Sequence, residues 1–397
     1  MKIKIGVFFG GRSVEHEVSI ISAIQAIDNL DKTKYDVIPV YITKENEMYV
    51  GEKIGNIEEY KNIKKLLSES QRVILVPNGE KVELIKYPFK KFGKNEYDYI
   101  DLAFPVVHGT NVEDGTLQGY FKTMGLPFVG PDVLSSAVGM DKYVMKTILK
   151  YNNIPVLDCL RFDAKDYTSN CKKIIADSEA KFEYPVIVKP INLGSSVGIK
   201  VARNSEELQE AIDYAFQYAM NILIEKAVTN LKEINCSVIG DYEEAIASEC
   251  EEPVSTDEIL SYEDKYIGGS KDSGSKGMAT LKRKLPAEIS NDVREKIRNM
   301  AVDTFKALGC NGVSRIDFII DTKTNEIFVN EINTIPGSLS FYLWEPVGVK
   351  YPELLDRMIV KALKRDREEK SITYSFDTKI LEGISLNGLK GSKGTKQ

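Results

Sequence analysis

The chain has 397 residues, which exceeds the limit of about 250–300 residues for a single hydrophobic core, so we expect two or three domains. Its 43% hydrophobic and 28% charged residues are typical of a soluble globular protein, and its net charge of −6 argues against a basic face that wraps nucleic acid. Charged residues interrupt every apolar run before the roughly 20 residues of a membrane span, which argues against a transmembrane protein.

Cysteine and histidine usage narrows the class further. Five scattered cysteines without C-x-x-C spacing, and no apolar N-terminal segment long enough for a secretory signal, predict reduced thiols in the cytoplasm. Only two histidines are present, His16 and His108, so a zinc centre of His and Cys is difficult to build. A metal would need oxygen ligands, which favour Mg²⁺. We therefore expect a cytoplasmic multidomain enzyme or binding protein.

The first 130 residues alternate strand-like and helix-like segments. A strand, a helix with apolar residues at helical spacing and a second strand follow one another closely, which predicts a βαβ unit and a parallel sheet. Residues 44–95 are polar and irregular, and we predict no elements there. The expected strands are residues 4–9, 35–42 and 99–107, and the expected helices are residues 18–30 and 117–124.

Two loops in this part of the chain directly follow expected strands: residues 10–17, GGRSVEHE, and residues 108–115, HGTNVEDG. In open α/β sheets, ligands bind at the carboxyl ends of the strands. Both loops are therefore candidate parts of a binding site.

The remainder of the chain divides into a connector near residues 130–142, a second unit, a third unit from about residue 221 to residue 365, and a tail. The last expected helix ends before Gly309, a residue type suited to a helix C-terminus. Two strands joined by the turn-like DTKTNE predict a hairpin. The expected strands are residues 184–189, 222–225, 313–320 and 327–333, and the expected helices are residues 206–218 and 291–308.

The hairpin carries charged residues within otherwise hydrophobic strands. Since alternate residues of a strand share a face, Arg315 and Asp317 should lie together on the first strand. The same alternation places Val329, Glu331 and Asn333 on one face of the second strand. A structural Arg–Asp pair would explain part of this set, because buried charges are costly unless paired or metal-bound. Asp, Glu and Asn together, however, are the oxygen ligands that hold Mg²⁺ beside nucleotide phosphates.

Three further segments each have a functional interpretation and a purely structural one. The loop KPINLGSSVG, residues 189–198, offers backbone N–H groups, hydroxyls and Lys189 to phosphate oxygens, although an ordinary turn also fits. Residues 222–226 and Glu233 place two acids around a strand end, which by itself favours a solvent-exposed edge. The Gly-, Ser- and Lys-rich segment 256–286 is either a disordered insertion or a mobile lid that closes over an anionic substrate.

Taken in order, these motifs resemble those of the D-alanine–D-alanine ligases, members of the ATP-grasp superfamily. The resemblance covers nearly all of residues 1–365. It rests on eight blocks: GGRSVEHEVS (10–19), HGTNVEDGTLQG (108–119), GMDK (139–142), VIVKPINLGSSVGI (186–199), ILIEK (222–226), YEDKY (262–266), RIDF (315–318) and NEINTIPG (330–337).

The resemblance implies a role for each matching residue. Glu15 would bind the ammonium group of the first amino acid, and Ser195 and Tyr266 would complete a hydrogen-bonded network with it. Arg315 and the backbone N–H of Gly337 would stabilise the anionic intermediate. Further substrate contacts are implied for His108, Tyr342 and Leu343. ATP would be bound through phosphate contacts of Lys142, Lys189 and Lys265, adenine and ribose contacts of Glu225 and Glu233, and further contacts of Ser195, Lys226 and Val228. Two Mg²⁺ ions, with Mn²⁺ as an alternative, would be bound by Asp317, Glu331 and Asn333.

These roles replace the structural interpretation of Glu225 and Glu233 as part of a solvent-exposed edge. For His108, an ordinary loop histidine remains an alternative to a substrate contact.

The resemblance also implies the fold and the reaction. A parallel α/β domain (1–130) would precede a two-part ATP-grasp fold (131–220 and 221–365) and a partly disordered tail (366–397), so the chain would be a mixed α/β and α+β multidomain protein. As a carboxylate–amine ligase, it would transfer the γ-phosphoryl group of ATP to a carboxylate, and the amine of a second amino acid would attack the acyl phosphate. The product would be D-alanyl-D-alanine for peptidoglycan, made by a cytoplasmic homodimer that binds neither nucleic acid nor membranes.

Two segments depart from the pattern of the family. Five residues past Gly337, where the family places a serine that helps hold the carboxylate of the second substrate, this chain has Tyr342, with Ser338 or Ser340 as substitutes. The lid is longer and more basic than usual; it retains Tyr266 and contains no histidine, which favours amide over ester formation. Two alternatives stay open: an ATP-grasp ligase with a different amine acceptor, and a non-catalytic nucleotide-binding homologue.

Overall fold

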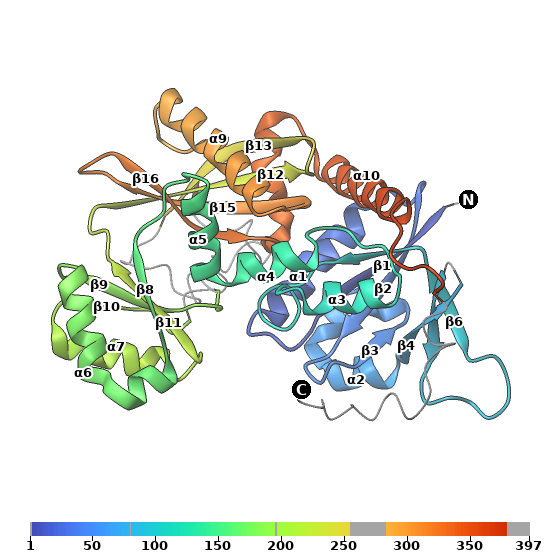
Figure 1. Ribbon diagram of the computed structural model, residues 1–397. Coiled ribbons are helices and arrows are strands. Elements are labelled where there is room, and N and C mark those ends of the chain that lie inside the picture. The colour runs from blue at the N-terminus through green and yellow to red at the C-terminus, as the bar shows by residue number, and fades with distance from the viewer. Residues whose placement is uncertain (1, 80, 195–196, 255–282, 379–397) are drawn as a thin grey trace, which may run out of the picture.

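The computed structural model describes residues 2–79, 81–194, 197–254 and 283–378. Most of the predicted lid lies outside the described residues, as do Ser195, Lys265, Tyr266 and the end of the predicted tail. Three β-sheets form the frame of the molecule, and helices pack against them (Figure 1). Among the described residues, no helix combines the length and the apolar character that crossing a membrane requires.

A seven-stranded sheet in the order β6-β5-β4-β3-β2-β1-β7 forms the N-terminal part of the chain. Strand β1 (Ile3–Gly10) runs parallel to β2 (Tyr35–Ile42) and to β7 (Leu102–Pro105), and α1 (His16–Asn29) connects the first two. The predicted βαβ unit is therefore confirmed. The other strands pair antiparallel: β3 (Met48–Val50), β4 (Gln71–Asn78), β5 (Lys81–Lys86) and β6 (Glu96–Ile100).

Two parts of this sheet differ from the sequence-based expectation. Residues 44–95 hold regular elements; in β4 only Val73 and Leu75 are fully buried, and such a short alternation is a weak signal. The single strand predicted over residues 99–107 is wrong, because β6 and β7 lie at opposite ends of the sheet order. At the break between them, the carboxylate of Asp101 accepts a hydrogen bond from the N–H of Lys4 at 2.9 Å. Residues 44–95 also contain η1 (Glu52–Gly55), η2 (Ile57–Asn62) and α2 (Ile63–Ser68).

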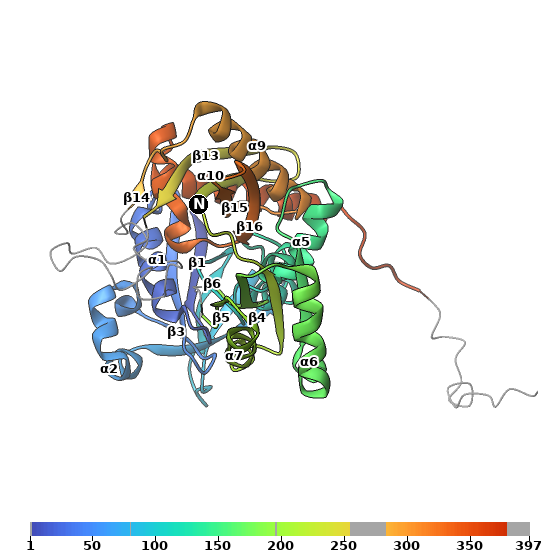
Figure 2. The same cartoon turned by 90° about the vertical axis from the view of Figure 1, so that its left-hand side faces the viewer.

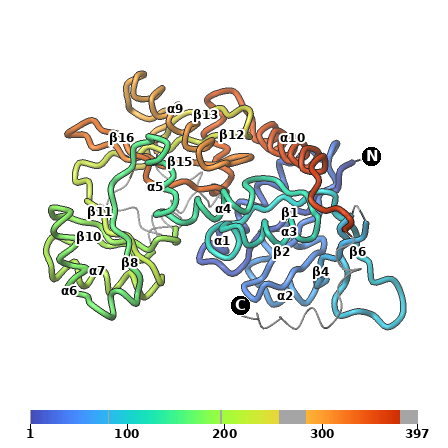
Figure 3. The backbone as a smooth tube through the Cα atoms, in the orientation of Figure 1, coloured from blue at the N-terminus to red at the C-terminus, as the bar shows by residue number. Residues whose placement is uncertain are grey.

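Helices α4 and α5 lie between the N-terminal sheet and the rest of the molecule (Figure 3). The carboxylate of Asp141 accepts hydrogen bonds from the N–H groups of Tyr143 and Val144 and thereby caps α5. Because of this cap, α5 begins at Lys142, whose side chain reaches the loop after β9. The helices of this part are α3 (Thr116–Thr123), α4 (Val133–Met140) and α5 (Lys142–Tyr151).

The second sheet has four antiparallel strands in the order β10-β9-β11-β8. Helices α6 (Ala164–Lys181) and α7 (Ser205–Ala215) lie together on one side of it (Figure 1). Leu208 and Ile212 of α7 share a hydrophobic core with Val188 of β9. The strands are β8 (Cys159–Asp163), β9 (Val186–Pro190), β10 (Lys200–Ala202) and β11 (Asn221–Lys226).

The third sheet has five antiparallel strands in the order β14-β13-β12-β15-β16. One face is apolar and packs against α9, which confirms the predicted helix. In both Figure 1 and Figure 2, α9 and α10 lie at the top of the molecule, and α6 and α7 lie at the bottom. The elements are β12 (Leu231–Gly240), β13 (Ala245–Pro253), β14 (Arg283–Lys284), α9 (Asn291–Ala307), β15 (Gly312–Asp321), β16 (Glu326–Asn333), η4 (Gly337–Leu343), η5 (Glu345–Val347) and α10 (Tyr351–Lys370).

The predicted hairpin is confirmed as β15 and β16, but the predicted face of Val329 is wrong. Asp317 pairs with Glu331 and Phe318 pairs with Val329, so Asn330 is an extra residue that forms a bulge. The bulge shifts the alternation by one residue, and Val329 therefore packs in the core with Phe318. Glu331 lies on the same face of the sheet as Asp317, and the side chain of Asn330 can point away from that face.

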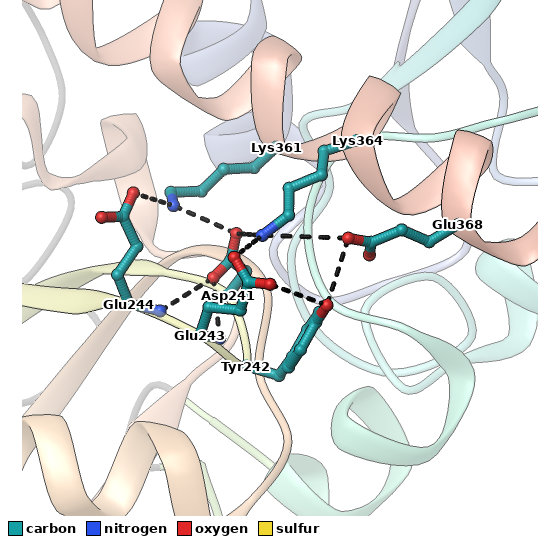
Figure 4. A network of polar contacts seen from close by, with 7 residues as sticks. All are labelled: Asp241, Tyr242, Glu243, Glu244, Lys361, Lys364 and Glu368. Carbon is teal, nitrogen blue, oxygen red and sulfur yellow. Dashed lines mark hydrogen bonds and ion pairs between the residues drawn. The ribbon is translucent and has the colours of Figure 1, made fainter.

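A network of charged residues holds α10 to the turn between β12 and β13 (Figure 4). The carboxylate of Asp241 lies 3.3 Å from Nζ of Lys361 and 3.1 Å from Nζ of Lys364. It also accepts hydrogen bonds from the backbone N–H groups of Glu243 and Glu244, both at 3.0 Å. Since α10 also contributes to the core of the N-terminal sheet, this network ties the first sheet to the third.

Candidate active site

The polar face of the five-stranded sheet carries a row of side chains that crosses four strands. Glu251 of β13 pairs in register with Asn235 of β12, Asn235 pairs with Asp317 of β15, and Asp317 pairs with Glu331 of β16. We call these four residues the polar row. Adjacent strands lie about 4.8 Å apart, so the row is a continuous polar strip rather than a set of separate sites.

The predicted metal-binding residues are brought together at one end of this row: Asp317 and Glu331 belong to it, and Asn333 lies beside Asp317. Asp317 accepts two hydrogen bonds from the guanidinium of Arg315, both at 2.7 Å, and one from the amide of Asn333 at 3.0 Å. Burial alone would lower the pKa of Arg315, but Asp317 raises it well above its ordinary value, so the guanidinium stays charged. Within the described ranges no three His, Cys, Asp or Glu side chains are grouped to hold a metal, so Asn333 would have to complete the predicted set.

Lys142 connects this row to the loop after β9. Its Nζ lies 3.1 Å from the carboxylate of Glu331 and donates a hydrogen bond to the carbonyl of Leu193 at 2.8 Å. Its backbone N–H donates to the carbonyl of Ile191 at 3.1 Å. The start of α5, the loop after β9 and the β15–β16 hairpin therefore meet at Lys142.

Lys189 belongs to a buried charge cluster that sequence reasoning found only in part. Lys189 and Lys146 both contact the carboxylate of Glu225, and all three side chains are no more than 5% exposed. Burial alone would raise the pKa of Glu225, but the two lysines lower it, so the carboxylate stays ionised. Lys189 also donates to the side-chain oxygen of Asn330 at 3.3 Å, so the bulge in β16 aims Asn330 at this lysine.

Lys146 is a site residue that sequence reasoning missed. It lies one helical turn after Lys142 on α5, and this i, i+4 spacing was the available signal. The other predicted nucleotide contacts are spread around β11 and β12: Lys226 ends β11, Val228 follows in the next loop, and Glu233 lies two residues before Asn235 on the same face of β12. Their contacts with a nucleotide stay predictions.

Glu15 lies between two of the predicted binding loops. A methyl group placed on Gly109 would lie 2.8 Å from a carboxylate oxygen of Glu15, and one placed on Gly194 would lie 3.4 Å from the same oxygen. Glycine at Gly109 therefore allows the first loop to approach the carboxylate closely, and its φ of +81° also favours glycine. The carboxylate thus adjoins the residue before Ser195, its predicted partner.

His108 is more than a loop histidine, because it ties three segments together. Its Nδ1 donates to the carbonyl of Ile335 at 2.8 Å, and its Nε2 lies 2.9 Å from the hydroxyl of Ser22. The same hydroxyl accepts a hydrogen bond from the N–H of Ser338 at 2.9 Å. Burial lowers the pKa of His108, although Glu15 opposes this effect, so the ring is neutral near pH 7.

Glu113, which lies in the same HGTNVEDG motif, is a second residue that sequence reasoning missed. Its carboxylate accepts hydrogen bonds from the N–H groups of Gly109 at 2.9 Å and Ile335 at 2.8 Å, and from the hydroxyl of Thr334 at 3.2 Å. Burial raises its pKa to about 7. Glu113 and His108 therefore hold the segment that leads into Gly337.

The segment after Gly337 has an unusual backbone. Ser338, Leu339 and Ser340 adopt φ values of 51°, 50° and 50°, in the left-handed region that residues with a side chain rarely adopt. Ser338 and Ser340 are buried, which does not favour either as a substitute for the family serine. Tyr342 is also buried, and its hydroxyl donates to the carboxylate of Glu251 at 3.1 Å, while Leu343 is fully buried.

Comparison with known proteins assigns this arrangement to a family. A family model described as D-ala D-ala ligase N-terminus matches residues 4–131, and one described as D-ala D-ala ligase C-terminus matches residues 148–360. The D-alanine–D-alanine ligase of Thermosipho melanesiensis is 39% identical over 381 residues, which cover 96% of this chain and 98% of the relative. That of Caldicellulosiruptor bescii is 40% identical over 380 residues, which cover 94% and 99%.

Solved structures agree with the sequence relatives. The D-alanine–D-alanine ligase of Coxiella burnetii superposes with a TM-score of 0.76 at 29% identity, covering 93% of this chain and 96% of that one. A D-Ala:D-Ser ligase from Enterococcus faecalis superposes with a TM-score of 0.75 at 32% identity, covering 91% and 100%. The predicted ATP-grasp architecture is thereby confirmed, and the chain belongs to the D-alanine–D-alanine ligase family.

Proposed function

We propose that this chain joins two D-alanine molecules in an ATP-dependent reaction and so supplies D-alanyl-D-alanine for peptidoglycan synthesis. One observation carries the proposal: Glu15, Lys142, Lys189 and the polar row, which come from distant parts of the sequence, converge on one site. Relatives about 40% identical over nearly the whole chain, named for this reaction, support it. We also propose domains over residues 1–130, 131–220 and 221–365, a cytoplasmic location and a homodimer.

Two residues of the polar row, together with Asn333 beside them, fit the two Mg²⁺ ions that this family reaction implies, and Mn²⁺ would fit the same donors. Asp317, Glu331 and Asn333 offer two carboxylates and an amide oxygen, which are hard ligands. ATP with Mg²⁺ would supply the phosphoryl group that activates the first carboxylate, with its charge neutralised by the metal.

The residues of the chain would position the reactants and balance their charge. Lys142 and Lys189, whose amines lie at the loop after β9, would neutralise the phosphates. Glu15 would hold the ammonium of the first D-alanine. Arg315, which Asp317 keeps charged, would meet the negative charge that develops on the carbonyl oxygen when the amine of the second D-alanine attacks and phosphate leaves. No side chain is required as a nucleophile.

Phosphate release tests this proposal. With ATP and Mg²⁺ present, D-alanine should stimulate phosphate release and yield the dipeptide, while L-alanine should not. Glu331→Gln should abolish turnover, because it removes a carboxylate from the metal set. Glu326→Gln, on the exposed start of the same strand, is the matched control and should keep normal turnover. If Glu331→Gln keeps a near-normal kcat, Glu331 is not a metal ligand; if no D-amino acid stimulates release, the proposed reaction is wrong.

A ligase with a different amine acceptor is the second candidate. Tyr342 favours it, because a tyrosine stands where the family pattern predicts the serine of the acceptor site, and a structural relative at 32% identity is named a D-Ala:D-Ser ligase. Mixed incubations of D-alanine with D-serine, followed by mass analysis of the dipeptides, separate the two. A non-catalytic homologue gains no support from any described residue, because the acids and lysines that turnover needs are present.

A further inference from the structure

The connection between β5 and β6, residues 87–95, carries exposed aromatic side chains among lysines. Phe89 and Phe92 are 60% and 86% exposed, although both are large apolar residues. The segment contains no acidic residue, and its lysines are exposed as well: Lys90, Lys91 and Lys94. Exposed apolar side chains that gather in one place mark a surface that contacts another molecule. We call residues 87–95 the aromatic loop.

Side-chain contacts support the shape of the aromatic loop. The amide of Asn95 accepts a hydrogen bond from the N–H of Lys90 at 2.7 Å and donates one to the carbonyl of Lys90 at 3.2 Å. These two bonds close a turn that contains Phe92. The ring of Phe89 meets the ring of Tyr87 edge to face at 5.7 Å, and the guanidinium of Arg72 lies 4.7 Å from the centre of the Tyr87 ring. Both phenylalanines are therefore presented by a supported turn.

The aromatic loop lies away from the proposed active site. Strand β6 stands at one end of the order of the seven-stranded sheet, and β7 stands at the other. Figure 1 shows the loop projecting at the right of the molecule, whereas the second sheet, which carries Lys189 and Glu225, lies at the left. The proposed ligase reaction uses none of the residues of the loop.

The size and the charge of the aromatic loop favour a lipid surface over a protein partner. A stable protein interface takes about 20–30 residues from each partner, which is more than the loop contains. A bilayer needs no matching shape, because its interface accommodates aromatic rings and its anionic headgroups attract lysines. The whole chain has a net charge of −6, so an anionic surface would attract the basic loop and repel the rest of the protein. The loop would therefore also set the orientation of the bound protein.

We propose that the aromatic loop binds the surface of an anionic phospholipid bilayer, with Phe89 and Phe92 in the interface and the lysines at the anionic headgroups. The contact is peripheral, and salt weakens it because the lysines supply part of the attraction. The inference goes beyond the proposed ligase reaction and does not depend on it. It replaces the expectation, drawn from the family resemblance, that the chain does not bind membranes.

Sedimentation with lipid vesicles tests the inference on the full-length protein. Vesicles of phosphatidylcholine mixed with phosphatidylglycerol should bind the protein, and vesicles of phosphatidylcholine alone should not. The double variant Lys90→Gln with Lys91→Gln should weaken binding about thirtyfold, because each lysine beside an anionic surface contributes about fivefold. Phe92→Ser should weaken binding at least fivefold, because an apolar ring no longer leaves water.

Matched variants elsewhere on the surface are the controls. Lys172→Gln with Lys173→Gln removes the same charge from α6, and Tyr151→Ser removes an aromatic ring that is 89% exposed at the end of α5. Neither variant should change binding. Phe92→Trp tests insertion directly: its fluorescence emission should shift to shorter wavelength when the anionic vesicles are added. The natural tryptophan, Trp344, is fully buried and should not respond.

The inference is overturned if the loop variants bind anionic vesicles as tightly as the wild-type protein. It is also overturned if the protein sediments with the vesicles while the emission of Phe92→Trp does not shift. Absence of binding to both kinds of vesicle would overturn it as well and would leave an acidic protein surface as the partner. Because the loop variants change exposed side chains, their urea unfolding should match that of the wild-type protein, and dipeptide formation, measured separately, tests only the ligase proposal.

Discussion

Replacement of Lys146 by methionine tests how the buried cluster around Glu225 is balanced. Lys146 and Glu225 have side chains only 2% and 1% exposed, and Lys189 is the second cation on the same carboxylate. Breaking a buried ion pair by removing one partner costs about 3–5 kcal/mol, because it leaves a charge in a medium that cannot solvate it. Since Lys189 still contacts Glu225 in the variant, we expect the lower end of that range, about 3 kcal/mol.

The assay is urea unfolding, with a matched control on the same helix. Lys150 lies one turn after Lys146 and pairs with Asp158, but these side chains are 53% and 55% exposed. Lys150→Met should therefore cost less than about 1 kcal/mol. The double variant Lys146→Met with Glu225→Gln should recover part of the lost stability, because no buried carboxylate then lacks its partner.

The result that refutes this reasoning is an equal, small loss of stability in Lys146→Met and Lys150→Met. The charge of Glu225 would then be neutralised by Lys189 alone, and Lys146 would contribute nothing to it. A double variant that is less stable than Lys146→Met would likewise contradict the charge argument, since it would point to packing rather than to charge.

Two further predictions concern the fold around the site. Although burial alone would raise the pKa of Asp241, backbone N–H groups and Lys364 lower it from 3.8 to about 2. The carboxylate therefore stabilises the fold fully above pH 4, and this stabilisation is lost as the pH falls toward 2. Asp241→Asn should remove this part of the acid sensitivity and lower the free energy of unfolding by about 2 kcal/mol at pH 7, measured by urea unfolding. In Gly139→Ala the new methyl group would lie 2.6 Å from the side chain of Thr334, which Glu113 holds. Stability should therefore fall by about 1–3 kcal/mol, although alanine has the better helix propensity, and turnover should fall as well. Unchanged kinetics would contradict this crowding.

The sequence was most informative where chemistry and strand periodicity coincide. Alternation within the hairpin correctly grouped Arg315 with Asp317 and Glu331 with Asn333, because neighbouring strands hold their side chains at a fixed spacing. The alternation failed at Val329, since a single extra residue at Asn330 shifts the register and no local signal in the sequence marks a bulge.

Residues that act through long-range contacts were beyond sequence reasoning. Glu113 and Ile335 are 222 positions apart in the chain, and Tyr342 and Glu251 are 91 positions apart. Neither pair has a periodicity that would connect its members, and each depends on how separate segments pack. For Lys146, the spacing from Lys142 indicated the face of the helix, but the partner Glu225 lies on another element 79 positions away and could not be identified from the sequence.

The charges of the site explain why its acids can be held together before any ligand binds. Arg315 compensates Asp317, Lys142 compensates Glu331, and two lysines compensate Glu225, so each of these three carboxylates has a cation beside it. Metal ions that bound Asp317 and Glu331 would take over this compensation and release Lys142 toward the phosphates. In the proposed reaction an existing pair would be exchanged rather than a new charge buried, so these side chains would need little reorganisation when charge develops.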